Sequence, residues 1–142
     1  MVIFVYTDGA SRNNPGISAS GFAVFNNDKL IYKKSIYNGV QTNNFAEYTA
    51  VISALKWCKK NIGTDVDIIL YSDSELVIKQ LIGKYKVKSF NIIKLNYTAK
   101  ELIHEFKSIK FKNVLRSNYY ISMVDNDLNI LLDKISSEAN RQ

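Results

Sequence analysis

Residues 2–16 read VIFVYTDGASRNNPG, and the character of this stretch changes at Asp8. Val2 to Thr7 form a continuous apolar run rich in β-branched and aromatic residues, which is typical of a central strand buried on both faces. From Asp8 onward the residues are mostly small and polar, with glycine and proline, as in a turn. The sequence therefore predicts a buried strand that ends in a carboxylate.

Strands and helices alternate through the rest of the chain. Further strand-like runs cover 18–25, 30–37, 66–71 and 119–124, and residues 26–29 join the first two of these as a hairpin. Apolar residues at helical spacing predict helices over 43–60, 74–82, 91–106 and from Asn126 or Asp127 onward. The order β-β-β-α-β-α-α-β-α predicts a mixed α/β fold, and we expect residues 1–142 to form one domain.

The composition is that of a globular protein, with 46% hydrophobic and 23% charged residues. No apolar run approaches the roughly 18 residues that span a membrane, and we expect no signal peptide. The single cysteine, Cys58, cannot form an internal disulfide, which favours an intracellular setting. We also expect a monomer.

The positive charge is concentrated in one segment. Lys79 to Arg116 hold ten basic and two acidic residues, so 10 − 2 = +8, whereas the whole chain carries +6. Such a segment predicts a polyanionic partner. A solvated helix face with a lysine-rich loop is the alternative interpretation.

Three acidic residues occupy the ends of predicted elements. Asp8 ends the first strand, Asp73 ends the fourth, and Glu47 lies about one turn into the first helix. If strands one and four are neighbours, their carboxyl ends bring these aspartates together. Clustered carboxylates require protons or cations, and oxygen ligands favour Mg²⁺ or Mn²⁺. Taken singly, each has a simpler interpretation: the aspartates could cap a helix or form a turn, and the glutamate could complement the helix dipole.

The strings around these acids are more specific than the acids themselves. YTDGASRNNPG at 6–16, TNNFAEY at 42–48 and YSDS at 71–74 resemble the ribonuclease H family, type 1 branch, in the family's order. These strings are most similar to those of the compact forms found in archaea and in many bacteria and viruses. The resemblance covers essentially the whole chain and implies a five-stranded mixed sheet of order 3-2-1-4-5 flanked by helices.

The resemblance implies an endoribonuclease that hydrolyses the RNA strand of RNA–DNA hybrids and leaves 5′-phosphate and 3′-hydroxyl ends. Two Mg²⁺ ions, or Mn²⁺ as a substitute, would act together. Asp8 would bridge both ions, while Glu47 and Asp73 would hold one of them. Activity on double-stranded RNA stays open at this point.

The resemblance implies a fourth carboxylate on or just before the last helix. Residues 129–139 read NILLDKISSEA and match the family pattern best, which assigns the role to Asp133. Asp125 and Asp127 remain rival candidates, because a strand–helix junction could also direct a side chain at the cluster. The only histidine, His104, falls inside a helix and does not match the catalytic-loop histidine of many relatives.

The resemblance also implies contacts to the substrate through the polar groups around the acids. The residues expected to make them are Gly9, Arg12, Asn14, Thr42, Asn43, Asn44 and Glu75. The long basic handle of some relatives is not evident, and a short loop with Lys84, Lys86 and Lys88 is expected to replace part of its charge.

Two other functions use the same residues. The fold and carboxylates could serve a DNA nuclease or resolvase, although the TNN string and the NPG turn argue against it. A hybrid-binding module without activity is the second alternative, and the intact trio of Asp8, Glu47 and Asp73 argues against that.

Overall fold

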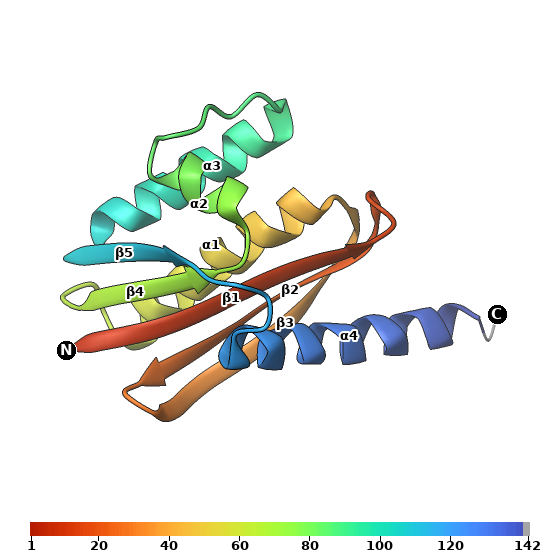
Figure 1. Cartoon of the computed structure of the whole chain (residues 1–142), viewed down its shortest axis with the longest axis horizontal. Helices are drawn as coiled ribbons and strands as arrows, with labels where there is room; N and C mark the ends of the chain where they lie inside the picture. Colours follow the sequence, from red (N-terminus) through yellow and green to blue (C-terminus); the bar gives the residue numbers. More distant parts are fainter. Residues whose placement is uncertain (141–142) are drawn as a thin grey trace.

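The computed structural model describes residues 1–140. A five-stranded sheet of order β3-β2-β1-β4-β5 forms the centre, as predicted (Figure 1). The strands are β1 (Val2–Arg12), β2 (Gly16–Asn26), β3 (Lys29–Gln41), β4 (Asp67–Ser72) and β5 (Ser108–Asn113). The helices are α1 (Asn43–Asn61), α2 (Glu75–Leu81), α3 (Phe90–Glu105) and α4 (Tyr119–Ala139).

The central strand β1 pairs with β2 over a longer stretch than with β4. It pairs antiparallel with β2 from Ile3 to Arg12, but parallel with β4 only from Val2 to Tyr6. The strand therefore runs past Thr7, where the sequence pattern ended it, and continues into the β1–β2 turn. Asp8 is held in the regular pairing with β2, beyond the last residue pair that β1 forms with β4.

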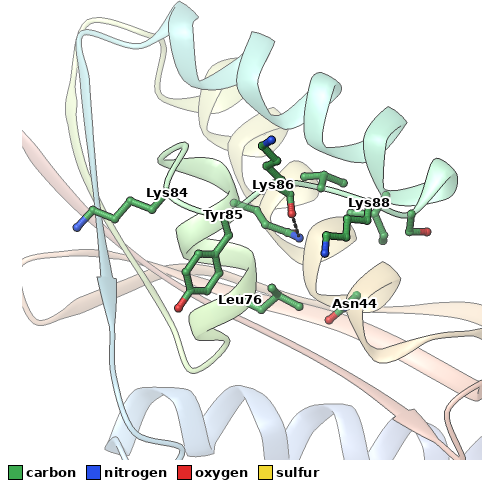
Figure 2. Close-up of a pocket in the computed structure, with 10 residues that line it drawn as sticks. Asn44, Leu76, Lys84, Tyr85, Lys86 and Lys88 are labelled. Carbon is green, nitrogen blue, oxygen red and sulfur yellow. Dashed lines mark hydrogen bonds between the residues drawn. The ribbon is translucent and has the colours of Figure 1, made fainter.

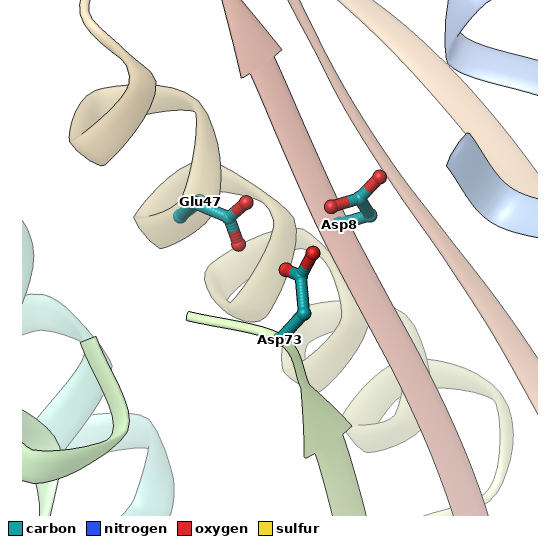
Figure 3. Close-up of side chains that lie close together, drawn as sticks. All are labelled: Asp8, Glu47 and Asp73. Atoms are coloured by element: carbon teal, nitrogen blue, oxygen red, sulfur yellow. The ribbon is translucent and has the colours of Figure 1, made fainter. Parts of the chain in front are cut away.

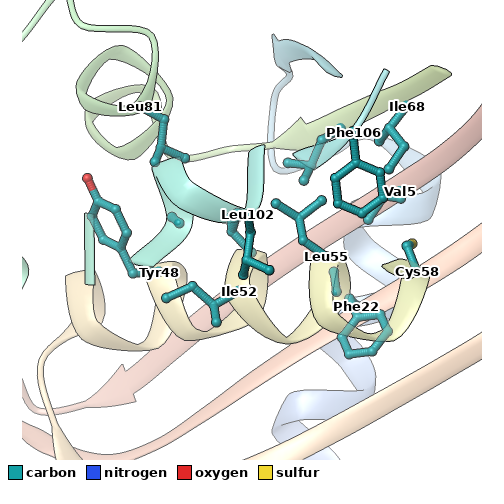
Figure 4. Close-up of a cluster of buried hydrophobic side chains, with 14 of the residues drawn as sticks. Val5, Phe22, Tyr48, Ile52, Leu55, Cys58, Ile68, Leu81, Leu102 and Phe106 are labelled. Carbon is teal, nitrogen blue, oxygen red and sulfur yellow. The ribbon is translucent and has the colours of Figure 1, made fainter. Parts of the chain in front are cut away.

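Helices cover both faces of the sheet. Figure 1 shows α1, α2 and α3 on one face and α4 alone on the other, packed across β1, β2 and β3. The larger core lies under α1 and α3 and includes Val5, Phe22 and Leu55 (Figure 4). Cys58 is fully buried in this core, and the Trp57 ring stacks on Tyr32 at 4.4 Å.

One predicted element is wrong. Residues 119–124, expected to be the fifth strand, form the first turns of α4, and the fifth strand is β5 instead. Asn118 caps the helix by accepting hydrogen bonds from the N–H groups of Tyr120 and Ile121. The last helix therefore begins seven residues before Asn126, and Asp125 lies within it.

Within residues 1–140, no helix is both long and apolar enough to cross a bilayer.

Candidate active site

Three carboxylates from three elements meet at one edge of the sheet. Asp8 lies on β1, Asp73 directly follows β4, and Glu47 lies in the second turn of α1. One oxygen from each lies within 4.8 Å of the others, and Figure 3 shows the three groups turned toward one another. The parallel pairing of β1 with β4 brings the two aspartates together, as the sequence predicted.

Glu47 reaches the cluster because α1 crosses β1 at Gly9, where there is no room for a side chain. A Cβ at Gly9 would lie 2.4 Å from backbone atoms of Ala46 and Glu47. This close approach lets the Gly9 N–H donate to Glu47 Oε1 at 3.0 Å. The absence of a side chain at Gly9 thus fixes the position of one carboxylate oxygen.

The cluster is buried and lacks protein partners for several of its oxygens. Asp8 is fully buried, and Glu47 is 6% exposed. Within residues 1–140, both oxygens of Asp8 and Oε2 of Glu47 have no hydrogen-bond partner. Burial and then the charges of Glu47 and Asp73 raise the pKa of Asp8. Burial and the charge of Asp73 also raise the pKa of Glu47.

This arrangement is costly for the protein alone. Buried polar atoms normally find partners, and buried like charges destabilise one another. A divalent cation would satisfy the free oxygens and cancel the repulsion, because hard cations bind sets of oxygen ligands. The residues present therefore fit a metal centre.

A fourth carboxylate approaches the cluster from α4. Asp125 is half-buried and lines the same cleft of about 460 Å³ as Glu47 and Asp73. Its charge adds to the raised pKa of Asp8, after burial and the charges of the other two acids. The Asn129 side chain donates to Asp125 Oδ2 at 3.3 Å and so helps to orient the group.

The structure places the two other candidates for this position elsewhere. Asp133 forms an ion pair with Arg12 at 2.6 Å, and its side chain is 72% exposed. Asp127 pairs with Lys33 of β3 at 3.3 Å. Eight helical residues separate Asp133 from Asp125 by about 12 Å. The geometry therefore brings Asp125, and not the expected Asp133, to the trio.

Comparison with known proteins agrees with this geometry. The family model for RNase H matches residues 1–127, which is most of the chain. The chain belongs to the RNase H family.

Several RNase H proteins resemble the chain over most of its length. Ribonuclease HI of Halobacterium salinarum is 36% identical over 116 residues, 81% of this chain and 57% of that protein. The crystal structure of RNase H1 from the same organism has a TM-score of 0.86 at 34% identity and covers 94% of this chain and 99% of that one. LC11-RNase H1, solved in complex with an RNA/DNA hybrid, has a TM-score of 0.83 at 29% identity, with 94% and 98% covered.

A longer relative contains the same unit as part of a larger protein. A bifunctional protein of Mycobacterium tuberculosis is 33% identical over 130 residues, which is 89% of this chain. The chain spans about a third, 35%, of that protein's length.

Arg116 is a site residue of this RNase H chain that sequence reasoning missed. It lies between β5 and α4, lines the cleft, and donates from Nε to Asp73 Oδ2 at 3.2 Å. This hydrogen bond to the Asp73 carboxylate raises the pKa of Arg116. The available signal was its place shortly before the last helix, where many RNase H members carry a catalytic-loop histidine.

The polar residues that the RNase H resemblance picked out join the β1–β2 turn to the start of α1. Asn43 N–H donates to Asn14 Oδ1 at 3.0 Å, and Ser11 N–H donates to Asn43 Oδ1 at 2.8 Å. Thr42 caps α1 by accepting from the Phe45 N–H at 3.2 Å. These contacts hold the turn against the helix at the rim of the cleft.

The other predicted contact residues divide between the cleft and its surroundings. Gly9, Arg12 and Asn43 line the cleft beside the carboxylates. Glu75, in contrast, is the first residue of α2 and pairs with Lys79 at 3.1 Å. Glu75 does not line the cleft.

The lysine loop forms a second concave surface next to the RNase H cleft. A cavity of about 600 Å³ is lined by Asn44 of α1 together with Lys84, Lys86 and Lys88 (Figure 2). Gln80 of α2 donates to the Lys86 carbonyl at 3.3 Å, which ties the loop to the helix. Asn44 thus lies with the three lysines, whereas Asn43, the residue before it in α1, lines the cleft with the carboxylates.

Proposed function

We propose that the chain is an endoribonuclease that hydrolyses the RNA strand of RNA–DNA hybrids with two divalent cations. The observation that carries the proposal is the set of buried carboxylate oxygens of Asp8 and Glu47, beside Asp73, that lack partners within residues 1–140. A similar RNase H1 has been solved with an RNA/DNA hybrid, which supports this substrate class.

Mg²⁺ is the proposed ion, with Mn²⁺ as a substitute, because the donors are all carboxylate oxygens. When bound, the cations would polarise the scissile phosphate and acidify the attacking water. Asp8, Glu47 and Asp73 would hold them, and Asp125 takes the fourth position that the sequence pattern assigns to Asp133. Asp8 is well suited to a central role because the β1 backbone around it is fixed by regular strand pairing.

Arg116 supplies positive charge beside the carboxylates. Its Nε pairs with Asp73, and its side chain is 68% exposed. The remaining guanidinium N–H groups are therefore available to a phosphate oxygen of a bound strand. We assign Arg116 the role of holding that phosphate. His104 is exposed on α3 and does not line the cleft, so it is not placed to act there.

Asn14 and Asn43 are the proposed readers of the hybrid's minor groove. Each uses its Oδ1 as an acceptor from a backbone N–H, so each keeps its Nδ2 as a donor. Minor-groove base edges and the RNA 2′-hydroxyl offer acceptors to such donors. The fixed link between the two asparagines would set the register of the hybrid relative to the metal site.

The lysine loop is proposed to hold the backbone of the hybrid beyond the cleft. Replacing Lys84, Lys86 and Lys88 by alanine should lower the magnitude of the slope of log K against log salt by up to about 2 to 3, since each phosphate contact contributes about 0.7 to 0.9. Binding to a catalytically inactive Asp73→Asn background at four salt concentrations measures this slope. An unchanged slope would remove the loop from the substrate surface.

The cleavage assay tests the function directly. Labelled RNA–DNA hybrid, double-stranded RNA, double-stranded DNA and single strands are incubated with Mg²⁺, Mn²⁺ or chelator. We expect internal cuts in the RNA strand of the hybrid only when metal is present, with 5′-phosphate ends. Cleavage of DNA would favour a resolvase-like enzyme, and binding of hybrid without any cleavage would favour the inactive module.

Matched variants test the assignment of the carboxylates. Asp125→Asn should lower kcat by about 100-fold or more, as removal of one charge-stabilising group commonly does. Asp133→Asn, on the same helix but paired with Arg12, should lower it by less than about threefold. The reverse pattern would return the fourth position to Asp133.

A further inference from the structure

The face of the sheet that carries α4 holds an aromatic cavity that shares no lining residue with the carboxylate cleft. Its volume is about 380 Å³. Ligand sites in proteins commonly occupy about 300–1,000 Å³, so this cavity suits a small molecule or one side chain. It is lined by Phe4, Tyr6, Phe25, Tyr71 and Tyr120, with Asn27 and Asp28 of the β2–β3 turn.

The rings are held in place by four different elements. Tyr6 of β1 stacks on Tyr71 of β4 with centroids 4.6 Å apart and planes 8° apart. Tyr120 of α4 packs on Tyr6 at 4.8 Å, and Phe25 of β2 packs edge-on to Tyr6 at 5.7 Å. Because the sheet and α4 fix the backbones of these residues, the aromatic walls are already formed without a ligand.

The lining is electronegative although the chain carries a net charge of +6. Within residues 1–140, the cavity is lined by one carboxylate, that of Asp28, and by no lysine, arginine or histidine. Burial, with added effects of Tyr71 and Tyr120, raises the pKa of Tyr6 to about 12, so its phenol stays neutral. Lys112 lies beside Tyr71 in the sheet but does not line the cavity.

We propose that this cavity binds an organic ammonium ion, either a free quaternary amine or an N-methylated lysine side chain. The faces of aromatic rings attract such cations, and several rings around one cation bind it more tightly than a single ring does. Asp28 supplies the counter-charge at the rim. A neutral aromatic ligand such as a nucleobase would stack on the same rings but would leave the Asp28 carboxylate unmatched. The proposal is independent of the nuclease activity.

A ligand titration followed by proton NMR tests the proposal. The probes are choline, the N-acetyl methyl amide of trimethyllysine, adenosine, and 3,3-dimethylbutanol, the uncharged analogue of choline. We expect the N-methyl resonance of a bound cation to move upfield, because the methyl groups lie over ring faces. The two cationic probes separate the two sources of the ammonium group by their relative affinities. The uncharged analogue should bind at least about fivefold more weakly than choline.

Variants tie the binding to this cavity. Asp28→Asn and Tyr71→Leu should each weaken choline binding by about fivefold or more, as expected for loss of a charge or of one ring. Glu138→Gln, which removes one exposed charge near the end of α4, is the matched control and should change nothing. Equal binding of choline and its uncharged analogue would overturn the proposal. So would tighter binding of adenosine, unchanged affinity in both cavity variants, or no binding of either cation at about 20 mM.

Discussion

Replacing Gly9 by alanine tests whether the close contact between β1 and α1 sets the geometry of the carboxylate cluster. The new Cβ would lie 2.4 Å from the Ala46 carbonyl carbon and from the Glu47 nitrogen, where ordinary contacts begin at 3.4 Å. The strand and the helix must therefore separate by about 1 Å, because 3.4 − 2.4 = 1.0. Both atoms are backbone, so no rotation of a side chain can relieve the clash.

The separation has two expected consequences of different size. Overpacking of this kind costs about 1–3 kcal/mol, which for a chain of this length lowers Tm by roughly 3–12 °C. The same movement stretches the 3.0 Å hydrogen bond from Gly9 N–H to Glu47 Oε1 and shifts Glu47 relative to Asp8. A displacement near 1 Å in a catalytic group can lower the rate by about 100-fold. The loss of activity should therefore exceed what partial unfolding explains.

The assay measures Tm by scanning fluorimetry and kcat on an RNA–DNA hybrid at 20 °C, well below the melting range. Gly39→Asn is the control, since Gly39 has a positive φ of 73° but open space around it. It should cost at most about 1 kcal/mol and leave kcat within about twofold. If Gly9→Ala keeps both the wild-type Tm and a kcat within about threefold, the contact does not control the site.

Three further outcomes follow from the buried polar groups. Asp8→Asn should raise the Tm of the metal-free protein at pH 8, measured in chelator, because it removes a buried carboxylate without a partner. The folded-state pKa values of Asp8 and Glu47 are raised, so their stabilising contribution is complete below their ordinary pKa values and is lost as pH rises toward the raised ones. The metal-free Tm should thus fall between pH 5 and pH 8, and Mg²⁺ should raise the Tm more at pH 8 than at pH 5. A Tm that rises with pH in chelator would contradict this. Tyr48→Phe should cost about 1–3 kcal/mol in urea unfolding, since the buried hydroxyl donates to Gln80 at 2.7 Å and accepts from Asn96 at 3.1 Å, and an unchanged unfolding midpoint would show that the network adds nothing.

The resemblance to the RNase H family was sufficient for the strand order, and the predicted strand ends for the three-carboxylate cluster, but neither was sufficient for the last third of the chain. β-Branched and aromatic residues dominate the segment 119–124 and therefore favour a strand there. Its helical spacing, with Ile121 and Val124 continuing to Leu128 on one buried stripe, is evident only when the cap at Asn118 is recognised. The strand that was missed, β5, has Ile109 and Phe111 on the core side, alternating with Lys110 and Lys112.

The fourth carboxylate of the site was also not identified from the sequence. An expected helix start at Asn126 or Asp127 puts Asp125 at a strand–helix junction, and the family pattern matches best inside the helix, at residues 129–139. The sequence pattern then favoured Asp133, whereas the side chain beside the trio is Asp125. Arg116 was missed for another reason: its role depends on the β5–α4 connection passing near Asp73, and the sequence indicates this only through the place of Arg116 before the last helix.

The position of α4 in the chain also bears on when the site becomes complete. The elements that carry Asp8, Glu47 and Asp73 leave the ribosome before α4, and domains fold as they emerge, at about 5–20 residues per second. A nascent chain therefore contains all three members of the trio before Asp125 has been made. On the proposed function, the ability to cleave would therefore arise only after α4 has been made and has packed on the sheet.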